Sequence, residues 1–558
     1  MPFNSGTGIT DMVTMLDKLI EVVVDSRHLA SVAINAGGTG HAIGDVIEIT
    51  ATGSTSTILA QLEVTSVAAG VIDGIRVYRS GAYTVDPTTI VANPQSGTSG
   101  AGISATFDLT FAAAKWVQNR RTQEAASAVV GTAGNGYNIG DILTLVDGVA
   151  GVRGDVDGTG TVGDAATFTV ATLTGGAGTG VATVTVTTVG NYEETPTNDA
   201  ATTNDGGGDD ACALTVTWQD GTFANNEFQV CQLEGEGLAG ADEIHVGIKT
   251  FSIVNGFDTA YNWMLLGMTG YSATLPIHQQ PGTHSDEINT SDGGWPITTT
   301  NGSYVILKND DADPDMEWWI SWNGRRIIMI MKVEGSSTTL YSSMYLGFLN
   351  QFGTDSEYPY PLWTCGHWYI HNTIWTDSTK IIGGIVEVCT NLGGNSKPKG
   401  PGYLRMPDGT YIGFASTVTG STGTTRTTSN NCIIYPFGTP PVQASPALAS
   451  TGGSFEWQIS NAPIPPTGVP GTPLGLLKPT PGTGDDWYML IAPTLMFTDD
   501  TWPTNHKMLG EIDGVFWFHT GGNTIVSEDR FVQGTKRYTI FANGNRTQVW
   551  SYFALDED

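Results

Sequence analysis

The first regular pattern of apolar positions predicts a short helix over residues 10–24. Apolar side chains recur there at the spacings of three and four that place them on one helix face: Met12, Leu16, Leu19, Ile20 and Val23. Thr10 or Asp11 can cap the first turn, and the β-branched run 22–24 weakens the far end. Because a helix this short is marginal in water, its apolar face needs a partner. Either a sheet of this chain or a second copy could supply that partner.

Downstream, apolar and polar residues alternate with a period of two, which predicts β-strands, and the pattern occurs twice. The first copy opens with GTGHAIGDVIEI at 38–49 and the second with GNGYNIGDILTL at 134–145. The copies close on the alternating strands ATFDLTF at 105–111 and ALTVTW at 213–218. We therefore expect two small β-modules, each with a glycine turn that leads into a half-buried strand.

Matching residues of the two copies predict a turn rather than a catalytic site. Gly40 and Gly136 lie in the turn, where glycine can adopt a positive φ. Asp45 and Asp141 follow at the same spacing, and we expect them to accept hydrogen bonds from local backbone amides. Two further matches follow later in each copy: Tyr83 with Tyr192, and Pro87 with Pro196.

Two stretches near the second copy have less regular patterns. Residues 112–128 are expected to form a short helix or an extended linker. Residues 151–180 are rich in Gly, Thr and Ala, which favours a long loop or a protruding hairpin.

From about residue 221 tryptophan becomes common, and alternating strands recur between Pro and Gly, as in YVILK at 304–308. This pattern predicts a large, Trp-rich, antiparallel β-sandwich-like C-terminal domain, with an internal division near 395–480. The predicted fold class is mainly β. The expected divisions are a helical attachment or oligomerisation segment, two modules with a linker between them, and the C-terminal domain: 1–28, 29–112, 113–123, 124–220 and 221–558.

The charge balance excludes some partners. The chain has 24 basic and 55 acidic residues, so its formal net charge is −31. Phosphate binding needs clustered Lys and Arg, and the only basic doublets are 120–121, 325–326 and 536–537, so no nucleic acid partner is expected. No run of 18 apolar residues predicts a membrane span, and the N-terminus has no secretory pattern. The five cysteines do not form a disulfide framework, because their number is odd and no CxxC occurs.

Two acidic runs are candidate calcium sites. Asp155 and Asp157 stand at positions 1 and 3 of a calcium-loop pattern, but Ala166 occupies position 12, where the pattern requires Glu. The second run carries four aspartates: Asp310, Asp311, Asp313 and Asp315. Solvated acidic loops are the favoured interpretation, with calcium as the alternative. We therefore predict no resident metal or cofactor.

Nucleophilic and zinc chemistry have little support in the sequence. Cys365, His367 and His371 form a CxHxxxH pattern, but zinc needs a fourth ligand or an open water site. Their aromatic surroundings favour buried histidines held by backbone hydrogen bonds. The chain also lacks a GxSxG elbow and a GxxxxGK[ST] phosphate loop. No catalytic residue is assigned, and the chain is predicted not to be an enzyme.

Several segments resemble structural proteins of tailed-bacteriophage virions. These are MPFNSGTGITDMVTMLDKLIEVV at the start, the Gly-rich repeat itself, SSMYLGFLNQFGTDSEYPYPLW at 342–363, and the segment 510–555 that begins GEIDGVFWFH. Similar Gly-rich β-modules recur in phage tail, baseplate and fibre proteins. The resemblance covers about a third of the chain, and it supplies no catalytic residues.

The resemblance implies a non-enzymatic virion component that is made in the host bacterial cytoplasm. A tail-associated place, in the baseplate or in a tail fibre with a receptor-facing surface, is the first expectation. A capsid decoration or head-fibre protein is an alternative. A tailspike that depolymerises host polysaccharide is a further one, and it predicts a carboxylate pair in an aromatic groove. The expected partners are other virion proteins, further copies of this chain in a homo-oligomer, for which a trimer is the usual expectation, and a host surface glycan or receptor.

Overall fold

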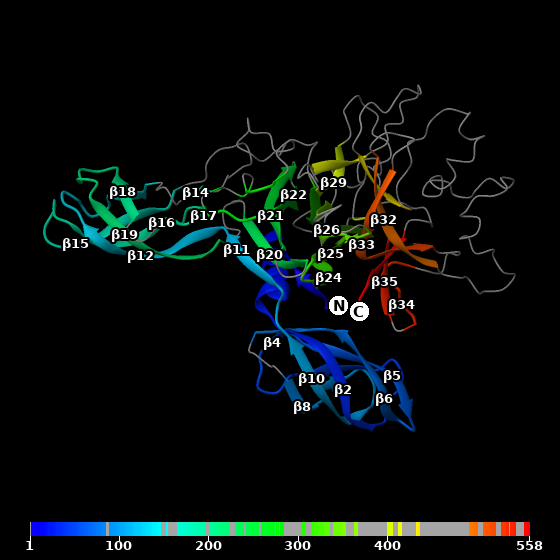
Figure 1. Cartoon of the computed structure of the whole chain (residues 1–558). Helices are drawn as coiled ribbons and strands as arrows, with labels where there is room; N and C mark the ends of the chain where they lie inside the picture. Colours follow the sequence, from blue (N-terminus) through cyan, green and yellow to red (C-terminus); the bar gives the residue numbers. More distant parts are fainter. Residues whose placement is uncertain are drawn as a thin grey trace, which may run out of the picture.

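The computed structural model shows a mainly β protein with one short N-terminal helix, and Figure 1 gives its arrangement. The structure describes these residues: 2–84, 89–146, 152–153, 165–196, 200–221, 229–238, 242–255, 258–273, 275, 277, 280–283, 303–308, 315–334, 339–352, 362–365, 385, 399–405, 411–415, 431–435, 490–499, 506–519, 526–534, 536–542 and 552–557. Within this part of the chain, no helix is both long enough and apolar enough to span a membrane. The predicted fold class is confirmed.

The N-terminal segment forms strand β1 (Phe3–Ile9), helix α1 (Met12–Ile20) and one π-helical turn, η1 (Glu21–Asp25). Asp11 caps the helix, because its carboxylate accepts hydrogen bonds of 2.9 Å from the amides of Val13 and Thr14. The helix ends where the β-branched run begins. Its apolar face is buried in the chain's own core, and Trp263 Nε1 donates a 3.0 Å hydrogen bond to Met12 O. The sequence left two possible partners for the apolar face of the helix, a sheet of this chain or a second copy. The structure shows a sheet of this chain.

The core beside the helix lies on a five-stranded antiparallel sheet in the order β11-β20-β21-β22-β23. Its strands are β11 (Trp116–Arg121), β20 (Val230–Leu238), β21 (Asp242–Asn255), β22 (Asp258–Met268) and β23 (Ser303–Lys308). Residues 113–123, expected to be a linker, therefore contribute an edge strand of this sheet. Its partner, β20, lies about a hundred residues further along the chain, so local periodicity cannot predict that these two strands pair.

The second sheet of this body is larger, with the order β1-β24-β25-β26-β28-β29-β30-β31-β32-β33-β36-β35-β34, and β27 pairs with β33. Its pairs are antiparallel except β30 with β31. Its further strands are β24 (Met316–Asn323), β25 (Arg326–Glu334), β26 (Thr339–Phe348), β27 (Asn350–Gln351), β28 (Leu362–Cys365), β29 (Lys399–Arg405), β30 (Tyr411–Ala415), β31 (Asn431–Tyr435), β32 (Leu490–Asp499), β33 (His506–His519), β34 (Arg530–Gln533), β35 (Lys536–Ala542) and β36 (Tyr552–Asp556).

Strand β24 is buried on both faces, which explains its run of large apolar residues. Trp318 and Trp322 belong to the core shared with α1 and the five-stranded sheet. Trp319 points the other way and packs edge-on against Phe541 of β35, with ring centroids 5.0 Å apart. The large sheet therefore curls until its β35–β36 end lies against its β24–β26 end. Residues 1–28 belong to this layered body, since β1 pairs with β24.

Two smaller units, modules 1 and 2, leave the body at separate places (Figure 1). Module 1 contains β2 (His28–Thr39), β3 (Val46–Ile49), β4 (Ser56–Ile58), β5 (Ala60–Ala68), β6 (Val71–Arg79), β7 (Ala82–Tyr83), β8 (Thr89–Pro94), β9 (Gly97–Thr98) and β10 (Ile103–Ala112). Module 2 contains β12 (Gln123–Ala133), β13 (Ile142–Leu145), β14 (Val152–Arg153), β15 (Thr167–Leu173), β16 (Val181–Thr188), β17 (Tyr192–Glu194), β18 (Ala200–Asn204) and β19 (Cys212–Asp220). Each module has a hydrophobic core of its own.

The glycine turn has the same structure in both modules. Gly40 and Gly136 have φ values of 77° and 88°. Asp45 Oδ2 accepts a 2.9 Å hydrogen bond from the amide of Ala42, and Asp141 Oδ2 accepts the equivalent 2.9 Å bond from Asn138. The predicted turn role of both aspartates is confirmed.

The matching tyrosines anchor the two module cores. Tyr83 and Tyr192 are buried, and their hydroxyl oxygens accept hydrogen bonds from the amides of Ala60 (3.0 Å) and Ala166 (2.9 Å). Strands β15 and β16 of module 2 thus correspond to β5 and β6 of module 1. Within 151–180, the described residues from 165 onward form part of the β15–β16 hairpin, which is the second of the two predicted alternatives. This hairpin belongs to the module's own sheet and is not an insertion.

Candidate functional site

A cluster of ion pairs and hydrogen bonds joins module 1 to the body. We call its residues the docking cluster: Glu63, Tyr78 and Arg79 of module 1 with Arg530, Arg537 and Glu557 of the body. Arg537 is its centre. Its guanidinium donates a 2.7 Å hydrogen bond to Tyr78 O, pairs with Glu63 at 3.3 Å, and forms an ion pair with Glu557. The contact spans more than 450 residues of sequence.

Charge balance explains why this cluster is stable although it is buried. The side chain of Glu557 has no exposed surface, and it pairs with Arg530 at 3.2 Å as well as with Arg537. Arg530 also lies over the ring of Tyr78, 4.3 Å from its centroid. Burial lowers the pKa of both Arg79 and Arg530, and the Glu557 carboxylate opposes that shift. Without Glu557, the buried Arg537 and the half-buried Arg79 and Arg530 would face one another with insufficient negative charge.

A second contact fixes module 1 without charge. Asn4 of β1 is buried, and its side-chain amide donates to Gly81 O at 3.0 Å and accepts from Gly81 N at 2.8 Å. Ser80 adds two hydrogen bonds to Phe3. Strand β1 therefore joins the large sheet on one side and module 1 on the other.

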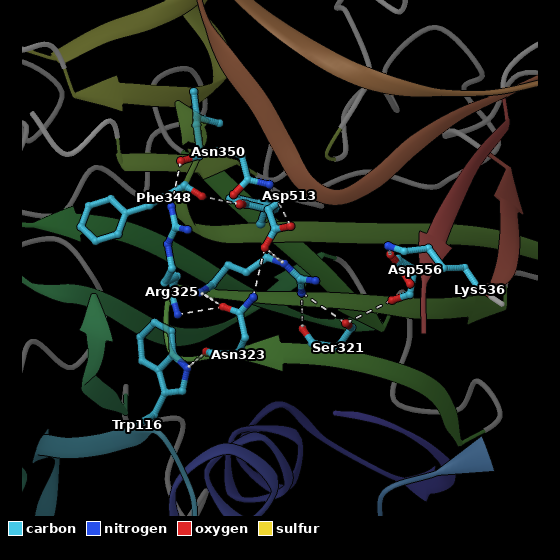
Figure 2. A network of polar contacts seen from close by, with 12 residues as sticks. Trp116, Ser321, Asn323, Arg325, Phe348, Asn350, Asp513, Lys536 and Asp556 are labelled. Atoms are coloured by element: carbon cyan, nitrogen blue, oxygen red, sulfur yellow. Dashed lines mark hydrogen bonds and ion pairs between the residues drawn. The ribbon is translucent and has the colours of Figure 1, made fainter. Parts of the chain in front are cut away.

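A second polar network lies inside the body around the ion pair of Arg326 with Asp513. Figure 2 shows Asp513 with Asn323, Asn350 and Trp116. Arg326 has no exposed side-chain surface, and its Nε donates a 2.9 Å hydrogen bond to Asp513 Oδ2. Asn323 and Asn350 also donate to the Asp513 carboxylate, at 3.0 and 3.1 Å. Trp116 Nε1 donates to Asn323 O at 2.6 Å, which links β11 to the same network.

This network is suited to fixing geometry rather than to catalysis. Burial raises the pKa of Asp513, but the positive charge of Arg326 and its hydrogen bonds outweigh burial, so the pKa lies below its usual range. The carboxylate is thus ionised and fully engaged as an acceptor. Through Asn323, Arg326 and Asn350, it joins the β24–β25 turn and β27 to β33.

A polar crevice of about 690 Å³ lies between α1 and the base of module 2. Arg121 crosses it, forming an ion pair with Asp17 of the helix and a 3.5 Å contact with Asp220 of β19. Burial, followed by the negative charge of Asp220, raises the pKa of Asp25 in its lining. Asp11 is committed to capping the helix. The crevice therefore contributes an attachment of the module 2 stem.

Most of the sequence-predicted metal candidates lie outside the residues that the structure describes. Asp155, Asp157, Asp310, Asp311 and Asp313 lie outside the described residues, as do His367 and His371. Asp315 is exposed at the start of β24, and Cys365 ends β28. The part of the chain that the structure describes contains no group of three or more His, Cys, Asp or Glu residues placed to hold a metal ion.

The buried polar networks were missed by sequence reasoning, although one signal marked them. Each of the three basic doublets contributes at least one buried arginine: Arg120 and Arg121 at the module 2 stem, Arg326 in the body, and Arg537 in the docking cluster. In a chain with only 24 basic residues, adjacent pairs of them stand out. Comparisons with protein-family models and with curated proteins gave no match.

Proposed function

We propose that this chain is a non-enzymatic structural component of a tailed-phage virion, with a place in the tail, as part of a baseplate or fibre. The observation that carries the proposal is the architecture of repeated modules on one layered body. Module 1 is fixed to the body through the docking cluster, whereas module 2 extends from it on the paired strands that lead into and out of it (Figure 1).

The polar groups support an assembly role. Arg326, Arg537 and Glu557 are buried and paired with other groups of the chain. Buried charges used in this way set the relative positions of parts, because each pair is favourable in one geometry only. A particle component that has to present two modules at fixed places needs such positioning. The resemblance of the N-terminal, 342–363 and 510–555 segments to virion proteins points in the same direction.

The location is tested by immunogold electron microscopy of purified particles, with antibody raised against the folded chain. Gold at the tail tip or on fibres supports the proposal, and binding to host cells is then the next assay. Gold spread over the head replaces the tail assignment by a capsid decoration role, to be followed by measurements of capsid stability. Protein found only in the lysate, with no gold on any particle, contradicts the virion proposal.

A further inference from the structure

The two modules differ most on one outer face. In module 1 this face includes Glu63 paired across β5 and β6 with Arg76, and it is the face that docks on the body. Because the amides of Gly44 and Gly140 make equivalent 2.9 Å hydrogen bonds to Val64 O and Val170 O, positions of the two modules can be matched one by one.

That match places threonine where module 1 has Glu48, Glu63, Arg76 and Arg79. Glu63 and Arg76 correspond to Thr169 and Thr185, which pair across β15 and β16. The row Glu48, Gln61 and Arg79 corresponds to Thr144, Thr167 and Thr188. Thr203 of β18 extends the second row onto a fourth strand. We call these residues of module 2, with Thr172, Thr183 and Thr187, the threonine face.

The threonine face is ordered by its own hydroxyl groups. Thr169 and Thr187 lie with their Oγ atoms 2.6 Å apart, as do Thr172 and Thr183, and Thr167 contacts Thr188 in the same way. Thr183, Thr185 and Thr187 are exposed. The β-branched side chains have few rotamers, so the hydroxyl positions are fixed before any partner arrives.

The hairpin of β15 and β16, which makes up most of the face, carries no charge. The sequence has no charged residue between Asp164 and Glu193, although the chain as a whole has a net charge of −31. Because both copies are acidic, they repel each other over most of their surface. The hairpin of β15 and β16 has no charged residue and does not contribute to this repulsion. A hydroxyl group both donates and accepts, so a threonine surface can face an identical surface. A contact between identical patches is what two-fold symmetry requires.

From this geometry we propose that the threonine face of module 2 is a contact between two copies of the chain, related by a two-fold axis. Module 1 shows that the equivalent face of this fold serves as an interface. Because the threonine face lacks these charges, it is not complementary to a charged surface such as Arg530, Arg537 and Glu557 of the body. The proposal goes beyond the virion assignment and does not depend on it, because the contact is measured in solution.

The size of the face sets the expected strength. The four strands have 4 to 8 residues each. With about 3.4 Å per residue and about 4.8 Å between strands, they give a face on the order of 400 Å². Stable interfaces bury about 800 Å² on each partner. The contact is therefore weak and reversible for two isolated chains, and it gains strength when many copies are held together in one assembly.

The test is sedimentation velocity of the full chain over a concentration series up to high micromolar. We expect reversible dimers that strengthen with added salt, because salt screens the repulsion between acidic copies and leaves hydroxyl contacts intact. The double substitution Thr185→Asp with Thr187→Asp should raise the dimer dissociation constant about tenfold or more, because it places like charges across the axis. Both positions are exposed, so folding is preserved.

The matched control is Thr217→Asp. Thr217 is equally exposed in module 2 but lies on β19, which pairs with β12 and β18 rather than with β15 or β16. It should leave dimerisation unchanged. As a second readout, Thr185→Cys should form a disulfide-linked dimer faster than Thr217→Cys. A wild-type chain that stays monomeric, as expected if a neutral glycan is the true occupant, overturns the proposal. So does association that the paired aspartates do not weaken.

Discussion

Modules 1 and 2 share a fold and a core but differ in what they do with one face. Their glycine turns and buried tyrosines are equivalent atom for atom in hydrogen bonding. Their outer faces are opposite in character, with Glu63, Arg76 and Arg79 on one and threonines on the other. Positions that fold the module are thus common to both copies, whereas positions that decide its contacts have diverged.

The attachments show the same contrast. Module 1 is held by a buried ion cluster and by Asn4, so its position relative to the body is strongly specified. Module 2 continues from the body through paired strands, with Arg121 bridging Asp17 and Asp220 at their base. We infer that one repeat serves as a fixed part of the body and the other as its projecting arm.

The largest expected effect is on the docking cluster. Glu557→Gln removes the buried carboxylate that pairs with the buried Arg537 and the half-buried Arg530, and it leaves their charge uncompensated. The expected cost is about 3–5 kcal/mol of docking free energy. Hydrogen exchange should accelerate in β6 of module 1 and stay unchanged in β16 of module 2.

The control for that variant is Glu236→Gln, the same chemical change in an exposed ion pair. Lys115 and Glu236 are 2.8 Å apart, but their side chains are 43% and 55% exposed, so the loss should stay below about 1 kcal/mol. Equal acceleration in both modules after Glu557→Gln contradicts the view that the cluster holds module 1 alone.

A pH effect of the next size is expected at His28, where the chain passes from the body into module 1. Burial, together with the positive charge of Lys115, lowers the pKa of His28 to about 4 from an ordinary value of 6.5. The folded state therefore disfavours protonation. This contribution to stability is complete above pH 6.5 and is lost as the pH falls from 6.5 towards 4, by about 3 kcal/mol at most.

The measurement is hydrogen exchange of β2 as a function of pH, corrected for the intrinsic rate. His28→Gln should flatten the dependence between pH 6.5 and 4. Module 2 has Glu124 at the equivalent position, so β12 serves as an internal reference that lacks this histidine. A pH profile that is the same with and without His28 rules out this assignment.

The shared core provides a third comparison, in which the two modules should respond alike. Tyr83→Phe leaves the buried amide of Ala60 without its acceptor, and Tyr192→Phe does the same to Ala166. Each should cost about 1–3 kcal/mol. Tyr83 also donates to Ile49 O at 2.9 Å, a hydrogen bond that phenylalanine cannot make. Local opening energies from hydrogen exchange of β5 and β15 give both values, and a large loss in one module only contradicts equivalent cores.

Most of the local structure of the modules could be predicted from the sequence. Alternation, the positive φ of Gly40 and Gly136 and the turn bonds of Asp45 and Asp141 depend on neighbours a few residues away. The Asp11 cap is local in the same sense. These features follow from periodicity and turn chemistry, which a single sequence records.

The assembly of the body could not be predicted in the same way. Strand β1 pairs with β24, Trp116 bonds to Asn323, and Arg326 pairs with Asp513, all at separations of more than 180 residues. Periodicity identifies a strand but not its partner, and residues 116–121 lack even the alternation, since Arg120 and Arg121 are adjacent and both buried. The basic doublets were the one sign of these sites.

The smallest expected effect concerns the turn that both modules share. Asp45→Ala and Asp141→Ala each remove one hydrogen bond to an exposed amide that water can replace, so each should cost about 1 kcal/mol in its own module. The turn also contacts the neighbouring strand through its backbone. Val64 N of β5 donates to Asp45 O, and Val170 N of β15 donates to Asp141 O, both at 2.9 Å. The backbone part of that arrangement survives the substitutions, which is why the loss stays small. Paired thermal unfolding and exchange data on β3 and β13 should show matched shifts in the two modules. A loss of stability in module 1 alone would mean that Asp45 is important because module 1 docks on the body, and not because of the turn. The two repeats would then be equivalent in their cores but not in their turns.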